Sequence, residues 1–140
     1  MKYLLDTNIV AFFLRGAYLL DAKIREVGIA NCFVSEITLL ELEYGVANSA
    51  PEWKNRNQES LDNFSGAFEG RVLPIRNAFK LYAKNRVRLR KAGTPISDFD
   101  LLIGSTSVVN GLIMVSENVS ELSRIEGIRL ENWIFRQKSK

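Results

Sequence analysis

KYLLDTNI, at residues 2–9, opens the chain with a short apolar strand that ends at an acidic residue, Asp6. Thr7 or Asn8 can cap a helix that begins directly after this strand. The same alternation of strand and helix continues along the chain. Further apolar strands are predicted at residues 29–34, 71–75, 112–116 and 129–133. Apolar strands separated by helices are typical of a parallel sheet covered on both faces. We therefore predict an α/β fold, an α/β/α sandwich around a central parallel sheet of about five strands.

The length of 140 residues is enough for one domain with its own core. We predict this domain at residues 1–135 and a basic tail at residues 136–140. No apolar run approaches the ~18 residues that a membrane span needs. The apolar opening also stops at Asp6, which is too soon for a signal peptide. The expectation is a cytoplasmic protein without a membrane segment.

The composition excludes several kinds of catalytic site, because the chain has no histidine and a single cysteine, Cys32. Without histidine there is no Ser-His-Asp triad, no Cys-His pair, no histidine zinc site and no histidine-driven RNA cleavage. A lone cysteine forms neither an internal disulfide nor a thiolate metal cluster, and apolar neighbours predict a buried thiol. A hydrolase of this composition must rely on carboxylates and a hard metal ion.

Three acidic residues stand where such a site is expected. Asp6 follows the first strand, Glu41 lies in the helix after the second, and Asp100 lies near the start of the helix before the fourth. Ligands of parallel sheets bind beyond the carboxyl ends of the central strands. If the first strand is central, the three acids converge there. Taken singly, Asp6 could be a helix cap and Glu41 a solvated surface residue. Asp98 is better placed to face the helix dipole, and whether it joins the site stays open.

Three carboxylates in one pocket repel one another and are driven toward protonation unless a cation neutralises them. Mg²⁺ suits such a pocket, because it takes about six oxygen ligands and usually keeps several waters. A bound metal also makes its water more acidic and stabilises charge that builds on an attacked phosphate. The acidic residues therefore predict a magnesium-dependent hydrolytic site that works by metal-activated water.

The charge of the chain is uneven, although its net value is only +3. Residues 71–92 contain eight basic residues and no acid, whereas the remainder contains eleven basic and sixteen acidic residues. Four of the cations recur at every fourth position and form one ridge on a helix. This basic ridge consists of Arg76, Lys80, Lys84 and Arg88. It predicts contacts with RNA phosphates, and a solvated helix face is the alternative.

Two helices carry apolar residues at helical spacing. Ile37, Leu40 and Tyr44 fall on one face of the helix after the second strand, which is the pattern of an amphipathic helix. Phe79 and Leu89 lie opposite the basic ridge and are expected to face the core.

Four blocks of sequence follow one another in a fixed order. They are KYLLDTNI, the pattern S-x-I-T-x-x-E-L-x-Y-G at residues 35–45, TPISDFDLLIGSTSV at residues 94–108, and LIMVSEN followed by IEGIRLENW. Together they resemble the VapC branch of the PIN-domain family over residues 2–133. The resemblance implies a parallel-sheet α/β/α sandwich and an endoribonuclease that depends on Mg²⁺, with Mn²⁺ as a substitute. It also implies a small VapB-like antitoxin that blocks the acidic cleft, and a homodimer.

The resemblance carries the three catalytic acids of the family onto Asp6, Glu41 and Asp100. In this scheme Asp6 and Asp100 hold the metal. Glu41 helps to bind the metal or orients the attacking water.

The resemblance also assigns supporting residues. Thr7 and Asn8 correspond to the polar pair that supports the first acid. Ser116 matches a small hydroxyl residue after the fourth strand. A fourth acid of many PIN domains falls on Asn118, which is not acidic, so the choice between one and two metal ions stays open. Glu117 or Glu121 could instead supply the missing carboxylate.

The resulting hypothesis is a toxin that cleaves structured RNA, with tRNA or rRNA expected, and inhibits translation until its antitoxin neutralises it. One alternative is a PIN-fold RNA-binding module without catalysis. Another is a phosphatase or a phosphotransfer receiver. The phosphatase would need an acid two residues after Asp6, where the chain has Asn8, and the receiver would need paired acids near the first strand, which are absent. The sequence identifies neither the RNA nor the antitoxin.

Overall fold

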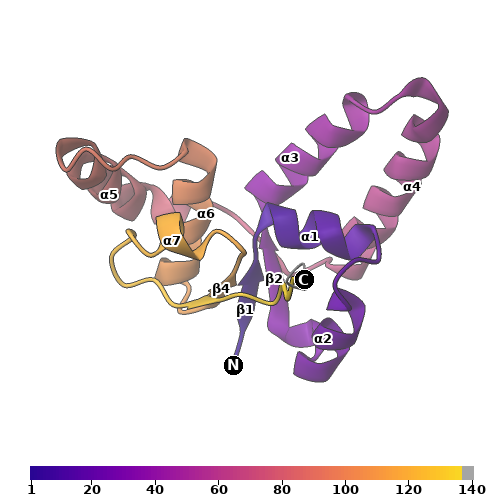
Figure 1. Ribbon diagram of the computed structural model, residues 1–140, viewed down its shortest axis with the longest axis horizontal. Helices are drawn as coiled ribbons and strands as arrows, with labels where there is room; N and C mark the ends of the chain where they lie inside the picture. The colour runs from indigo at the N-terminus through magenta and orange to yellow at the C-terminus, as the bar shows by residue number, and fades with distance from the viewer. Residues whose placement is uncertain (137–140) are drawn as a thin grey trace, which may run out of the picture.

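The structure is a computed structural model, and it describes residues 1–136. These residues form a five-stranded sheet with helices around it (Figure 1). The strands are β1 (Tyr3–Leu5), β2 (Cys32–Ser35), β3 (Val72–Leu73), β4 (Ile113–Val115) and β5 (Leu130–Glu131). The α-helices are α1 (Thr7–Leu14), α2 (Leu20–Val27), α3 (Glu36–Ala47), α4 (Pro51–Ala67), α5 (Phe79–Lys91), α6 (Asp98–Val109) and α7 (Val119–Leu122). Two short 3-10 helices are η1 (Ile29–Asn31) and η2 (Arg76–Ala78).

The sheet is parallel throughout, with strand order β3-β2-β1-β4-β5. Strand β1 is central, because Tyr3 pairs with Cys32 of β2 and with Ile113 of β4. The carboxyl ends of β1, β2 and β4 therefore meet at one edge of the sheet. This confirms the predicted parallel sheet, and the central position of β1 meets the condition under which the three acids were expected to converge.

The side chains of β1 alternate between two buried layers, as a strand covered on both faces requires. Tyr3 and Leu5 lie in a cluster with residues of α1, α2 and α4, whereas Leu4 lies in a second cluster with residues of α5 and α6. Helices thus cover both faces of the sheet (Figure 1). The predicted α/β/α sandwich is confirmed.

The predicted start of the second strand was wrong. The strand starts at Cys32 rather than residue 29, because η1 occupies the first three positions. The side chain of Asn31 donates to the carbonyl of Val27 at 2.7 Å and keeps this stretch coiled against the end of α2. Helix α2 begins only at Leu20, because Tyr18 and Leu19 have φ of 56° and 54°. A left-handed backbone cannot be part of an α-helix.

Helix α3 does not bury its predicted apolar face. Ile37 is 7% exposed, but Leu40 and Tyr44 are 54% and 70% exposed. Leu39 and Leu42 pack against the core instead. Figure 1 shows the reason, because α3 and α4 run beside each other and project beyond the sheet. Most of α3 therefore packs against helices rather than against strands.

Helix α5 buries only part of the side opposite the basic ridge. Leu89 is 2% exposed, as predicted, whereas Phe79 is 49% exposed. Phe79 is the first residue of the helix and follows η2, so it lies at the end of the packed region.

The predicted basic tail lies mostly outside the described residues, which end at Arg136. Arg136 itself is docked on the domain. Its guanidinium donates to both carboxylate oxygens of Glu117 and to the hydroxyl of Tyr18, the latter at 2.7 Å. Within residues 1–136, no helix combines the length and apolar character needed to cross a bilayer.

Candidate active site

Asp6 stands at the carboxyl end of β1, where it caps α1. Its backbone is extended, and its Oδ1 accepts a hydrogen bond from the Thr7 amide at 2.8 Å. Its Oδ2 accepts a hydrogen bond from the Ser116 hydroxyl at 2.7 Å. The residue is 4% exposed. Both the cap role and the predicted position beyond the strand are therefore present in one side chain.

Burial raises the pKa of Asp6 to about 6, from an ordinary value of 3.8. The hydrogen bond from Ser116 opposes this rise in pKa, as does the bond from the Thr7 amide. The negative charges of Asp100 and Glu41 add to the rise. Asp100 and Glu41 therefore both act on Asp6 through space, and Asp6 resists ionisation.

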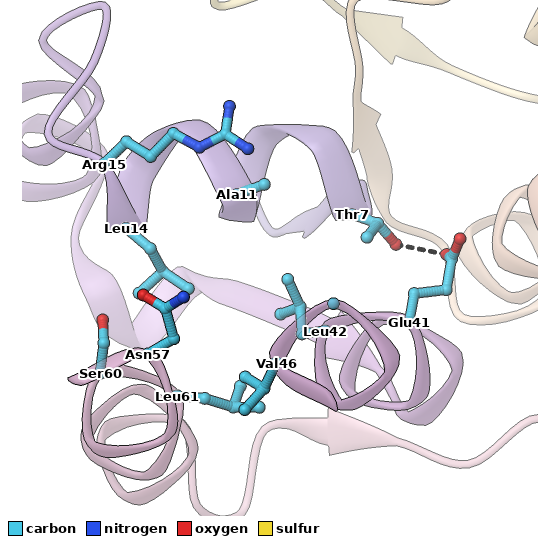
Figure 2. Close-up of a pocket in the computed structure, with 11 residues that line it drawn as sticks. Thr7, Ala11, Leu14, Arg15, Glu41, Leu42, Val46, Asn57, Ser60 and Leu61 are labelled. Atoms are coloured by element: carbon cyan, nitrogen blue, oxygen red, sulfur yellow. Dashed lines mark hydrogen bonds between the residues drawn. The ribbon is translucent and has the colours of Figure 1, made fainter. Parts of the chain in front are cut away.

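Glu41 reaches Asp6 from α3 through a threonine. The hydroxyl of Thr7 donates to Glu41 Oε1 at 2.7 Å, as Figure 2 shows, while the Thr7 amide donates to Asp6. Thr7 thus links the first acid to the second, which is a larger role than the predicted support of Asp6. Its predicted companion, Asn8, is exposed, and no hydrogen bond of its side chain is found in the described part of the chain.

Asp100 lies in the first turn of α6 and is half-buried. Ser97 caps this helix, and its hydroxyl accepts from the Asp100 amide at 3.3 Å. Asp98 points elsewhere. It accepts from the Tyr82 hydroxyl at 2.9 Å and pairs with Arg86 at 3.4 Å, both on α5. Of the two aspartates, Asp100 is therefore the one that acts on Asp6.

Asn118 contributes through its backbone rather than its side chain. Its amide donates to Ser116 Oγ at 3.0 Å, and Ser116 in turn donates to Asp6. The side-chain amide of Asn118 donates to Glu121 at 3.2 Å. Glu117 is engaged by Arg136, which lowers the pKa of Glu117. Both alternative carboxylates are thus already hydrogen-bonded.

The acids around Asp6 offer oxygen atoms that a metal ion could bind. Among residues 1–136, no three histidine, cysteine or acidic side chains lie close enough together to hold an ion by themselves. Mg²⁺ commonly binds one or two protein carboxylates and completes its shell with water. Asp6 and its acidic neighbours are oxygen ligands in a place where negative charge is disfavoured. These residues therefore fit a hard divalent cation that keeps part of its water.

A cleft of about 380 Å³ adjoins Glu41 (Figure 2). It begins at Thr7 and Glu41 and runs between α1, α3 and α4 to a polar end near Arg15. Its apolar lining consists of Ala11, Leu14, Leu42, Val46 and Leu61. No local pattern of residues indicates this cleft, because it forms only where α3 and α4 project from the sheet.

The basic ridge is partly occupied by contacts within the protein. Arg88 donates to Asn85 at 2.8 Å and to the carbonyl of Arg124 at 2.6 Å. Lys84 lies 3.8 Å from Glu126. Arg88 therefore ties α5 to the segment after α7, and the ridge is not the row of free cations that the spacing suggests.

One polar residue of the site, Thr38, was not predicted from the sequence. Its hydroxyl lies 3.0 Å from that of Thr7, and the residue is 0% exposed. The available signal was its position three residues before Glu41, which places both on one face of α3.

Comparison with known proteins places these features in context. The family model described as PIN domain matches residues 3–127. The tRNA(fMet)-specific endonuclease VapC of Salmonella typhimurium is 33% identical over 95% of this chain and 98% of its own length. Ribonuclease VapC2 of Rickettsia felis is 34% identical, again over 95% of this chain and 98% of its own.

Solved structures agree with these sequence matches. A chain of the DNA-bound VapBC structure from Salmonella typhimurium matches with a TM-score of 0.83 and 30% identity, over 95% of this chain and 98% of that one. A chain of FitAcB from Neisseria gonorrhoeae matches with a TM-score of 0.84 and 26% identity, over 94% of this chain and 97% of that one.

Proposed function

The chain belongs to the PIN-domain family, and we propose that it is an endoribonuclease of the VapC type, the toxin of a toxin–antitoxin pair. The observation that carries this proposal is the arrangement of Asp6, Glu41 and Asp100. Asp6 directly follows β1, Glu41 lies in α3 and Asp100 lies in α6, and the charges of Glu41 and Asp100 raise the pKa of Asp6. A phosphodiesterase without histidine needs such a set of acids.

We propose Mg²⁺ as the cofactor, with Mn²⁺ as a substitute, held by Asp6 and Asp100. When bound, such an ion acidifies water and stabilises negative charge on the attacked phosphate. Thr7 and Ser116 fix the two oxygens of Asp6. Thr7 also occupies Oε1 of Glu41, so Oε2 of Glu41 is left to accept a hydrogen bond from the attacking water. Glu41 thus orients the nucleophile.

The proposed substrate is a structured RNA, because the Salmonella relative is named for tRNA(fMet) and the Rickettsia relative for ribonuclease activity. Cleavage of tRNA or rRNA would inhibit translation. Arg76 and Lys80 are exposed on the basic ridge and are the cations best placed to contact phosphates. Lys84 contributes less because of Glu126, and Arg88 acts by holding α5 in place.

The proposed partner is a small VapB-like antitoxin, since the similar structures are VapBC complexes. The cleft that begins at Glu41 offers such a partner an apolar path that leads to the acids. We also propose a homodimer, as in the sequence-based hypothesis.

The test compares cleavage of initiator tRNA and of a total tRNA pool, in Mg²⁺ and in excess chelator. Asp6→Asn and Asp100→Asn should each slow cleavage more than ~100-fold, which corresponds to about 3 kcal/mol of transition-state stabilisation. Asp98→Asn is the matched control, because Asp98 is bound to α5, and its rate should stay within about three-fold of wild type. Cleavage that survives exhaustive chelation would contradict the proposed mechanism.

A further inference from the structure

Thr38 is a fully buried hydroxyl residue of α3 that contacts Thr7. Its Oγ1 lies 3.0 Å from Thr7 Oγ1, which lies 2.7 Å from Glu41 Oε1. Thr38 is in the first turns of α3, Glu41 is one turn later, and Thr7 begins α1. Three polar side chains from two helices thus form one line that ends at an acid of the site.

The direction of these hydrogen bonds follows from the number of protons available. An ionised carboxylate only accepts, and a threonine hydroxyl has one proton to donate. Thr7 must therefore donate its proton to Glu41. The Thr38 hydroxyl must then donate to Thr7, because Thr7 has no second proton. The line runs from Thr38 through Thr7 to Glu41.

We propose that Thr38 is a positioning residue, which fixes the hydroxyl of Thr7 so that Thr7 holds Glu41 in its working orientation. Glu41 is half-exposed, and Thr7 is the one donor found for it in the described part of the chain. A hydroxyl that accepts a bond also donates more strongly, by roughly 10–30% per bond in a chain. The consequence for catalysis rests on the function proposed above.

A parallel arrangement supports this role. The amide of Asn118 donates to Ser116 Oγ at 3.0 Å, and Ser116 donates to Asp6 at 2.7 Å. Asp6 and Glu41 are thus each held by a hydroxyl that is itself held by a second donor. For Glu41 the second donor is Thr38. The Thr7 hydroxyl occupies only one of the two carboxylate oxygens of Glu41.

The matched variants are Thr38→Val and Thr38→Ser. Valine keeps the shape but places a methyl group against the Thr7 oxygen, and a polar atom buried against carbon is unfavourable. Thr7 should then rotate its hydroxyl away, and Glu41 should lose its donor. In crystal structures, we expect the contact between Thr7 and Glu41 to be broken in Thr38→Val and kept in Thr38→Ser. A contact that survives in Thr38→Val overturns the proposal, whatever the protein's activity.

Kinetics give the second measurement. Thr38→Val should lower kcat about five-fold, the worth of one ordinary hydrogen bond, with KM for RNA unchanged, and Thr38→Ser should restore kcat. An equal kcat in Thr38→Val and wild type also overturns the proposal. A wild-type protein that binds no Mn²⁺ and cleaves no RNA would instead refute the proposed function. The crystallographic comparison would still decide the role of Thr38.

Discussion

The buried carboxylate of Asp6 lowers the stability of the fold when it is ionised. Its pKa in the folded protein is about 6, above the ordinary 3.8, chiefly because of burial. Folding therefore favours the protonated form, and the free energy of unfolding falls as pH rises from about 4 to about 6. Above pH 6 the ionised carboxylate costs up to about 3 kcal/mol, since one pKa unit corresponds to 1.36 kcal/mol. A bound cation would remove this cost.

We therefore predict that Asp6→Asn stabilises the metal-free protein at pH 7.5 by about 1–3 kcal/mol. Asparagine stays neutral, and its side-chain amide can donate to Ser116 Oγ. Urea unfolding in chelator should show this gain at pH 7.5 and little of it at pH 4.5. Mg²⁺ should then stabilise the wild type but not the variant. If Asp6→Asn instead lowered the free energy of unfolding at pH 7.5, the ionised carboxylate of Asp6 would not be destabilising.

The sequence located the three acids because Asp6 follows a strand, Asp100 lies in the first turn of a helix, and Glu41 lies inside the helix that follows β2. Local patterns reveal all three positions. Thr38 was missed, because its contact with Thr7 depends on how α1 packs against α3, 31 residues apart. The role of Asn118 was also beyond the sequence. Its side chain was expected to stand for a missing acid, whereas its backbone amide supports Ser116.

Among the elements, α6 contains a buried polar atom without a partner. Ser105 is 0% exposed, and its hydroxyl is the one buried side-chain polar atom within residues 1–136 that has no hydrogen bond. Ser107, also buried, donates to the carbonyl of Gly104 at 2.6 Å. Small residues are needed here, because a Cβ on Gly104 would meet Ile125 at 2.4 Å.

Ser105→Ala should raise the free energy of unfolding by about 1 kcal/mol, because folding removes the Ser105 hydroxyl from water without giving it another hydrogen bond. The matched control is Ser107→Ala, which removes a satisfied hydroxyl and should be neutral or destabilising by up to about 1.5 kcal/mol. Chemical denaturation of both variants measures the difference. Equal effects would show that the environment of Ser105 is no different from that of Ser107.

Local residues mark where several helices begin. Ser35 and Ser97 cap α3 and α6, and Pro51 is the first residue of α4. The start of β2 was missed, because the local contact of Asn31 with Val27 is joined by one that is distant in sequence. Arg71 donates to the carbonyl of Cys32 at 2.9 Å from 39 residues away.

The molecule as a whole combines a conventional sheet with a pair of helices that leave it. Helices α3 and α4 project together, so the space between them and α1 becomes a cleft that opens beside Glu41 (Figures 1 and 2). Apolar residues line its middle, and Arg15 lies near its far end. A segment lying in this cleft would contact apolar walls and reach the acids with one end.

This geometry predicts how the proposed antitoxin binds. A basic side chain at the Glu41 end can replace the charge of the metal, because arginine and lysine donate well to carboxylates. We expect the complex to show an arginine or lysine of the partner hydrogen-bonded to Asp6, Glu41 or Asp100. An open cleft with metal bound in the complex would contradict this.

The cleft wall offers the matched pair of variants for the same prediction. Val46 and Ala47 are neighbours at the end of α3, but Val46 lines the cleft and Ala47 does not. Val46→Asp places a charge in the apolar path, so it should weaken antitoxin binding at least ten-fold, or about 1.4 kcal/mol. Ala47→Asp places the same charge outside the path, and its affinity should stay near that of wild type. Titration calorimetry with the purified antitoxin measures both, and RNA cleavage by the two variants shows whether the acids remain intact. Equal weakening by both variants would place the antitoxin outside this cleft.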